Sequence, residues 1–198
     1  MSQILLLQSS LNGPVSRTNQ LMERFLQTRR EQGHQDQVAV CDLTALDLPV
    51  LDSPLFHALR GAEPANEAIR QAVALSDRLI AELKAADLLL IGAPMYNLNV
   101  PTPLKNWFDL VARAGVTFRY TDTYPMGLVQ GVNALVFSSR GGVHQGQTTD
   151  AVTPYLKSVL GLMGIPVEFV YAEGMDLRPH GAEQGMREAH ARIAGLGR

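Results

Sequence analysis

Residues 92–109, GAPMYNLNVPTPLKNWFD, directly follow an unbroken apolar run and combine flat, polarizable and amide side chains. Proline fixes its backbone φ and lacks an N–H, while methionine, tyrosine and leucine offer apolar surface. An asparagine and the backbone amides can hydrogen bond along the rim of a heterocycle. We therefore expect a flat ring with a polar edge to lie against Pro94, Met95, Tyr96, Asn97 and Leu98. The alternative is a proline-rich turn that only sets the start of the next helix.

Residues 9–18, SSLNGPVSRT, combine hydroxyls, a glycine and an arginine before a helical stretch. Unpaired N–H groups and the macrodipole at a helix start attract an anion, and hydroxyls add directed donors. Plain helix capping by Ser16 or Thr18 is the alternative. The chain has no G-x-x-x-x-G-K-[ST], and no G-x-G-x-x-G follows the first apolar run. The loop therefore favours a ligand with one phosphate over a tightly held dinucleotide.

A third loop, residues 138–144 with the sequence SSRGGVH, follows the fourth apolar run. Its two glycines permit close backbone approach, and His144 can donate a hydrogen bond or carry charge near neutral pH. Such a loop could stabilise negative charge that develops on a reduced ring. A solvated turn histidine is the alternative for His144.

Five apolar runs of strand length, at residues 4–7, 38–41, 88–91, 132–137 and 167–171, alternate with stretches of helical period. The helical stretches lie around residues 21–26, 69–83, 107–112, 155–163 and 183–194. Because the strands are apolar at consecutive positions, we expect them to be covered on both faces. This predicts an α/β, flavodoxin-like, doubly wound five-stranded parallel sheet with helices on both faces. Ligands of such sheets bind at the carboxyl ends of the strands, where the three loops would meet.

The 198 residues are 46% hydrophobic, and no linker, repeat or long apolar run interrupts them. We expect one domain over residues 1–198, with no membrane span and no signal leader, in the cytoplasm. The net charge of −2 offers no basic stripe for nucleic acid and favours a small-molecule partner. No H-x-x-x-H pair is present, so we expect no metal site, and the single Cys41 is expected to be a buried, inert thiol.

Three stretches in order, GAPMYNLNVPTPLKNWFD, ARAGVTFRYT and SSRGGVH, resemble the FMN-dependent NADH:quinone oxidoreductases known as azoreductases. The similarity extends from ILLLQSS to YAEG, nearly the whole chain. It implies a flavodoxin-like homodimer with a shared active site and with FMN bound non-covalently near the subunit interface. It further implies a ping-pong reaction in which NADH or NADPH reduces FMN, which then reduces a quinone or an azo compound.

The resemblance also assigns residues. Those implied to hold the FMN phosphate are Ser9, Ser16, Arg17 and Thr18. Those implied to cradle the isoalloxazine ring are Pro94, Met95, Tyr96, Asn97 and Leu98. Those implied to border its pyrimidine side are Ser139, Arg140, Gly141, Gly142 and His144. The implied catalytic set is His144, Asn97 and Tyr120, with Tyr120 lining the substrate pocket from the second subunit. Apart from the resemblance, no dedicated motif for the nicotinamide nucleotide is present, and the candidates for contacting it are Arg60 and Arg119.

Relatives differ from this chain at Leu98, where many have an aromatic residue, and within residues 145–149, so the shape of the acceptor pocket stays open. Two other functions also remain: a flavin-binding electron carrier or redox-regulated partner protein without small-molecule turnover, and a flavodoxin-like dimer without cofactor. The near-neutral charge disfavours the carrier, since carriers usually dock through a charged face.

Overall fold

A computed structural model describes residues 1–196. Its main sheet is parallel, with strand order β2-β1-β3-β6-β7. The strands are β1 (Gln3–Gln8), β2 (Gln37–Asp42), β3 (Leu88–Gly92), β6 (Asn133–Ser139) and β7 (Val167–Ala172). The five predicted strands and the fold class are confirmed, with boundaries shifted by at most two residues.

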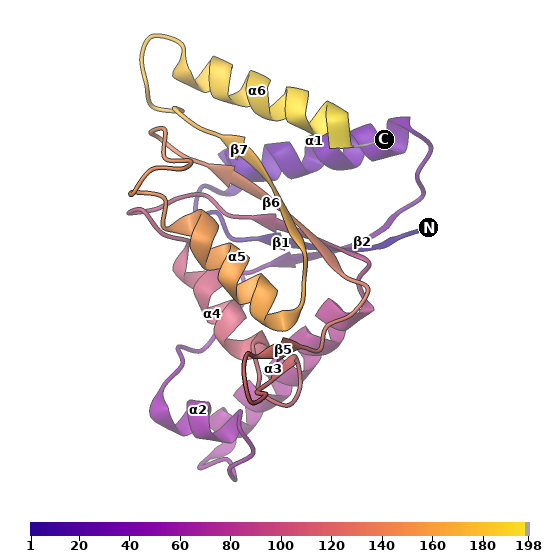
Figure 1. Ribbon diagram of the computed structural model, residues 1–198, viewed down its shortest axis with the longest axis vertical. Coiled ribbons are helices and arrows are strands. Elements are labelled where there is room, and N and C mark those ends of the chain that lie inside the picture. The colour runs from indigo at the N-terminus through magenta and orange to yellow at the C-terminus, as the bar shows by residue number, and fades with distance from the viewer. Residues whose placement is uncertain (197–198) are drawn as a thin grey trace.

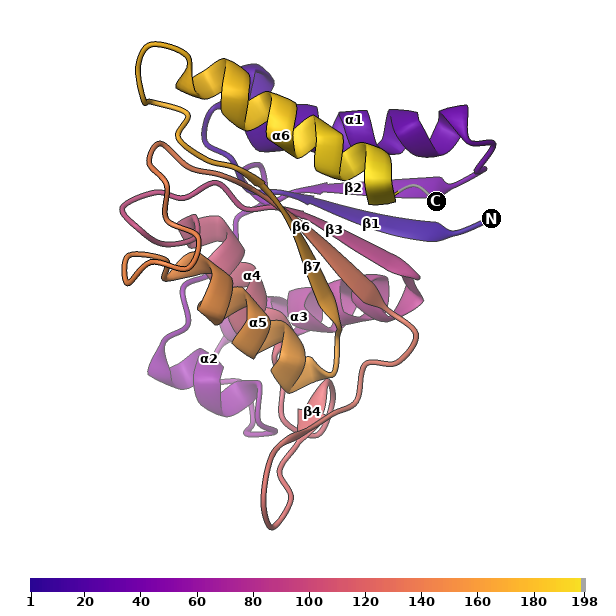
Figure 2. The ribbon, with the colours of Figure 1, turned by 45° about the horizontal axis from the view of Figure 1, so that its top comes forward.

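Helices cover both faces of this sheet (Figures 1 and 2). Helices α1 (Arg17–Glu31) and α6 (Gly181–Leu196) lie on one face, and α3 (Glu67–Ala85), α4 (Thr102–Val111) and α5 (Val152–Met163) on the other. All five coincide with predicted helical stretches. Within the second layer, the Phe108 ring of α4 meets Trp107 and Tyr155 edge to face, at centroid distances of 5.1 and 5.9 Å. The contact with Tyr155 joins α4 to α5.

Local signals explain where several helices begin and end. Ser16 caps α1 by accepting a hydrogen bond from the Asn19 N–H at 3.2 Å, and Asn66 caps α3 in the same way. Helix α5 ends at Gly164, whose φ of 85° is the left-handed conformation that glycine adopts readily. The sequence did not predict four short elements: η1 (Gly13–Val15), α2 (Ser53–Ala58), β4 (Phe118–Arg119) and β5 (Met126–Gly127).

Strand β2 departs from the expectation that every strand is covered on both faces. Strand β2 lies at the edge of the sheet and pairs with β1 alone. Its residue Val40 is 61% exposed, although the run 38–41 is apolar like those of the central strands. Cys41, expected to be buried, is half-buried. Burial still raises the pKa of its thiol to about 11, with smaller contributions from Glu82 and Asp42. A protonated thiol at neutral pH agrees with the expected inertness.

An ion pair holds the turn between α1 and β2, and its contribution to stability should depend on pH. Arg29 donates to both carboxylate oxygens of Asp36, at 2.6 and 2.8 Å, and the two side chains are only 15% and 7% exposed. The hydrogen bond from Arg29 lowers the pKa of Asp36. Because the folded-state pKa is depressed, the pair stabilises the protein above the unfolded-state pKa of about 3.9, and this stability is lost as pH falls through the folded-state pKa.

We therefore expect Asp36→Asn to lower the free energy of unfolding by about 2 to 3 kcal/mol at pH 7 and by much less near pH 3. Urea unfolding at both pH values measures this. Exposed Asp47 provides the control, since Asp47→Asn should change little at either pH. An equal loss for Asp36→Asn at both pH values would contradict the assignment.

Candidate active site

The three loops singled out in the sequence meet at the carboxyl edge of the sheet. The Tyr96 hydroxyl accepts a hydrogen bond from the Leu11 N–H at 3.1 Å and lies 3.2 Å from Ser10 Oγ, which joins the loop after β3 to the loop after β1. The Met95 N–H donates to the Ser139 carbonyl at 2.9 Å, which joins the loop after β3 to the loop after β6. The parallel topology thus brings together segments far apart in sequence.

A cavity of about 350 Å³ lies where these loops meet, and we call it the three-loop cavity. Seven residues from the predicted site line it: Arg17, Pro94, Met95, Tyr96, Ser139, Arg140 and Gly141. Sequence reasoning missed other lining residues, among them Met175, Asp176 and Ala182, from the loop after β7 and the start of α6. The fifth strand, β7, also ends at this edge of the sheet. The position of this strand in the sequence could therefore have identified the loop after it as part of the site.

Buried hydroxyls stand at the α1 end of this region. Ser16 and Thr18 are fully buried, and their hydroxyl oxygens lie 3.1 Å apart. Ser16 caps α1, as the alternative interpretation of this loop predicted. The amides of Arg17 and Thr18 nevertheless have no partner within the helix. Ser9 is also buried and donates its hydroxyl proton to the Gly92 carbonyl at 2.6 Å. The donor set suits a phosphate.

Glycine at position 92 lets α1 approach the end of β3. A Cβ there would lie 2.8 Å from Met22 Cε and 3.2 Å from Thr18 Oγ1. A larger residue would displace the end of the Met22 side chain and crowd the Thr18 hydroxyl.

The loop after β3 forms a tight turn in which Tyr96 and Asn99 exchange backbone hydrogen bonds of 2.9 and 3.0 Å. The two central residues, Asn97 and Leu98, have φ values of 49° and 65°. Asparagine tolerates this region, whereas leucine there is strained by about 1 to 3 kcal/mol, and such strain clusters at functional sites. The turn leaves Leu98 45% exposed, outside the lining of the three-loop cavity.

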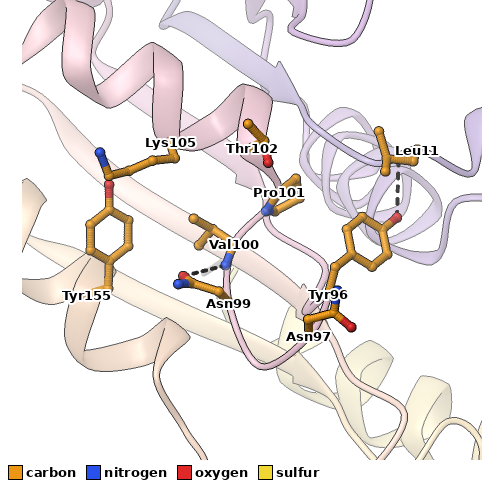
Figure 3. A pocket seen from close by; sticks show the side chains of 9 residues that line it. All are labelled: Leu11, Tyr96, Asn97, Asn99, Val100, Pro101, Thr102, Lys105 and Tyr155. Carbon is orange, nitrogen blue, oxygen red and sulfur yellow. Dashed lines mark hydrogen bonds between the residues drawn. The ribbon is translucent and has the colours of Figure 1, made fainter. Parts of the chain in front are cut away.

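A second cavity, of about 510 Å³, lies on the other side of Tyr96, and we call it the Tyr96–Tyr155 cavity (Figure 3). Asn97 and Tyr96 line one end, and Lys105 and Tyr155 line the other (Figure 3). Burial raises the pKa of the Tyr155 phenol, and the Asp109 carboxylate raises it further. Because Tyr96 lines both cavities, a ring bound against its loop would be reachable from the larger one.

Comparison with known proteins decides the family. A family model described as a flavodoxin-like fold matches residues 2–196. An FMN-dependent NADH:quinone oxidoreductase 4 from Burkholderia lata is 64% identical over 99% of both chains. The chain belongs to the FMN-dependent NADH:quinone oxidoreductase family. The resemblance seen in the sequence is thereby confirmed.

Other members of this oxidoreductase family agree. The FMN-dependent NADH:quinone oxidoreductase of Aeromonas salmonicida is 51% identical over 99% of both chains. Among solved structures, an azoreductase from Bacillus anthracis superposes with a TM-score of 0.87 at 28% identity, over 100% of this chain and 99% of the other.

The side chain of Arg140, a residue that the resemblance assigns to the pyrimidine side of the ring, points into the protein interior. The guanidinium is fully buried and lies 3.1 Å from Asp150 and 3.2 Å from Glu173, so this residue faces the three-loop cavity through its backbone. Burial acts to raise the pKa of Asp150, but hydrogen bonds from Thr153 and Arg140 outweigh it and lower that pKa. The sequence gave no sign of where its charge points, and its place beside a bound ring stays a prediction.

Gly142 and His144 follow Gly141 in the same loop. His144 is partly exposed, and its Nδ1 lies 2.8 Å from Thr149 Oγ1. A Cβ on Gly142 would lie 2.8 Å from His144 Nε2, so the imidazole stands against the Gly142 backbone, which follows the cavity-lining Gly141.

The remaining candidate residues from the sequence lie outside the three loops that meet at the cavity. Tyr120, 65% exposed, follows β4, which pairs with β5. Gly127 of β5 packs on Gly164 at the end of α5, which lies at the amino ends of the strands (Figure 2). Tyr120 is therefore remote from the three-loop cavity of its own chain. Its role in a second subunit of this oxidoreductase family stays a prediction.

Arg60 and Arg119 have their own contacts. The Arg60 guanidinium lies 4.1 Å from the Phe56 ring centroid beside a separate cavity of about 100 Å³, and Arg119 donates to Met126 Sδ at 3.4 Å. Among residues 1–196, no three His, Cys, Asp or Glu side chains are grouped to hold a metal ion. No helix in that same range is both long and apolar enough to cross a membrane.

Proposed function

We propose that this protein is an FMN-dependent NADH:quinone oxidoreductase that transfers two electrons from NADH, through bound FMN, to a quinone. The carrying observation is the three-loop cavity, which connects an anion-attracting helix start to the strained loop after β3. The family membership supports the same reading, since relatives at 64% and 51% identity over nearly the whole chain carry this name. Activity on azo compounds is part of the proposal, supported by the azoreductase from B. anthracis.

When bound, FMN supplies the redox chemistry, because its ring accepts two electrons from NADH and returns them to an acceptor. The chain supplies binding and orientation. Ser16, Thr18 and the amides of the first turn of α1 would hold the phosphate by charge-assisted hydrogen bonds. Ser9 and Arg17 would complete this end, although the Ser9 hydroxyl donates to Gly92 in the present arrangement.

The loop after β3 would support the ring. Met95 and Tyr96 offer apolar contact, and Asn97 together with backbone amides offers hydrogen bonds to the polar rim. His144, Gly141 and the other residues of the loop after β6 would face the pyrimidine side. There the imidazole can donate a hydrogen bond to negative charge on the ring.

Substrates would use the Tyr96–Tyr155 cavity. Its volume of about 510 Å³ accommodates a flat acceptor or a nicotinamide ring, within the range usual for small-molecule sites. NADH and the acceptor would occupy it in turn, because both must lie against the same ring. In a homodimer, Tyr120 of the second subunit would close this cavity.

The test begins with purified protein. We expect a yellow protein that releases FMN on heating. Double-reciprocal plots with NADH and a quinone should give parallel lines, the pattern of alternate binding. Intersecting lines would contradict the order of steps, and the absence of steady NADH oxidation would favour an electron carrier. A protein that remains colourless after incubation with FMN would overturn the function altogether. NADPH, tested alongside, shows which donor is preferred.

A further inference from the structure

The Arg140 guanidinium is the centre of a buried polar network behind the loop after β6. Besides its two carboxylates, it donates to Thr153 Oγ1 at 2.8 Å and to Ser138 Oγ at 3.2 Å. It also lies 4.7 Å from the ring centroid of Tyr171. One buried cation thus faces two carboxylates, of which Asp150 has a partner in the Thr153 N–H at 3.0 Å.

Glu173 has a different set of partners. A single oxygen, Oε1, accepts hydrogen bonds from the backbone N–H groups of His144 and Gln145, each at 2.8 Å, and from Arg140 at 3.2 Å. Its side chain is only 14% exposed. Glu173 therefore ties the loop after β6 to the end of β7, across 29 residues of sequence for His144 and 28 for Gln145.

Two further contacts then fix the imidazole. The Nδ1 atom of His144 is engaged by Thr149, and Nε2 stands beside Gly142. Gly142 in turn is held by its carbonyl, which accepts from the Gly174 N–H at 2.9 Å. The backbone of this loop is thus set by Glu173 and by the residues that follow it, not by His144 itself.

We propose that Glu173, oriented by Arg140, is a positioning residue for His144: it binds the His144 and Gln145 amides and thereby holds the imidazole at the pyrimidine side of FMN. This rests on the proposed function. A carboxylate suits the task because a charged acceptor makes stronger hydrogen bonds than a neutral one and Arg140 balances its charge in the interior. Without it, the two amides would pair with water and the loop would sample other conformations.

The first test uses the apoprotein, so that it does not depend on FMN. In protein labelled with ¹⁵N-histidine, Glu173→Ala should speed exchange of the His144 amide proton with solvent by at least about tenfold. Glu173→Gln keeps an acceptor oxygen and should retain most of the protection. Glu168→Ala is the matched control, since this glutamate lies on β7, shortly before Glu173, and pairs with Arg192 on the surface. Unchanged His144 exchange in Glu173→Ala would overturn the proposal.

The second test is a double-mutant cycle on the Kd for FMN and on the midpoint potential of the bound flavin. We expect Glu173→Ala to weaken FMN binding about tenfold and to shift the potential, with Glu173→Gln intermediate. In a His144→Ala background, Glu173→Ala should add almost nothing to either quantity, because its effect passes through the imidazole.

Full additivity of the two substitutions would overturn the positioning role. It would show that Glu173 affects FMN by a route that does not pass through His144. Urea unfolding of each variant measures any effect on stability separately. If the wild-type protein does not bind FMN, the proposed function fails and the cofactor part of this inference fails with it. The amide exchange of the apoprotein still decides whether Glu173 holds the loop.

Discussion

Arg140→Met should lower the free energy of unfolding by about 3 to 5 kcal/mol at pH 7, the usual loss when one member of a buried charge network is removed. Methionine keeps much of the stem but leaves Asp150 and Glu173 without their cation, and these side chains are only 6% and 14% exposed. The Ser138 and Thr153 hydroxyls lose a donor as well. Urea denaturation followed by circular dichroism measures the loss.

The loss of stability in Arg140→Met should depend on pH. In the wild-type protein, hydrogen bonds from Thr153 and Arg140 overcome burial and lower the pKa of Asp150, so its contribution is present above the unfolded-state pKa and is lost as pH falls through the folded-state pKa. Arg140→Met removes one lowering partner, and Asp150 then takes up a proton at a higher pH. The stability gap between wild type and variant should therefore narrow from pH 7 to about pH 4.5.

Arg192→Met is the matched control. Arg192 pairs with Glu168 at 2.7 Å, but both side chains are at least half exposed, and surface pairs contribute less than about 1 kcal/mol. Arg140→Lys separates charge from geometry, since lysine keeps the charge but cannot contact both carboxylates and the hydroxyls through a planar fork. A loss below about 1 kcal/mol for Arg140→Met would show that the network contributes little to stability.

The combined variant Ser16→Ala, Thr18→Ala should raise the Kd for FMN by about 10-fold to 100-fold, equivalent to about 1 to 3 kcal/mol. The two buried hydroxyls lie 3.1 Å apart at the start of α1, and each would donate to a phosphate oxygen. Titration of apoprotein with FMN, followed by flavin fluorescence, measures the Kd. Riboflavin lacks the phosphate, so its affinity should be the same in variant and wild type.

Loss of the helix cap accompanies this change, because Ser16 also accepts the Asn19 amide, and about 1 kcal/mol of stability should go with it. Thr28→Ala supplies the control: Thr28 is a buried hydroxyl of the same helix that bonds the Arg24 carbonyl, away from the cavity. It should leave FMN binding unchanged. Equal loss of FMN and riboflavin affinity in the double variant would mean that the hydroxyls support the fold of the loop and not the phosphate.

The two largest expected effects come from different parts of the protein. At the α1 start, the buried Ser16 and Thr18 hydroxyls would bind the negative charge that a ligand brings. Behind the loop after β6, the Arg140 cation pairs with two carboxylates inside the protein, and the proposed ligand would meet backbone and imidazole. Such a division agrees with a cofactor whose phosphate needs anchoring and whose ring needs orientation.

The sequence by itself determined the order of elements, the parallel sheet and the loops that form the site. Apolar runs at consecutive positions require cover on both faces, and a parallel sheet places the loops at one edge whatever the side chains do in detail. The candidate residues for ring and phosphate binding could be proposed because their chemistry is local: Met95, Tyr96 and Asn97 are adjacent, and Ser16 and Thr18 lie within one turn. The family resemblance lay in these same stretches.

Only the tertiary structure decided where long side chains point and which strands lie at the edge of the sheet. Arg140 lines the cavity, but its guanidinium turns toward Asp150 and Glu173, which are separated from it by 10 and 33 residues. A buried cation turns toward whichever carboxylates the fold brings near. The apolar β2 proved exposed because strand order, which periodicity does not report, set it at the edge. The loop after β7 joined the cavity for the same reason: its residues carry no local signal, and the position of their strand alone brings them there.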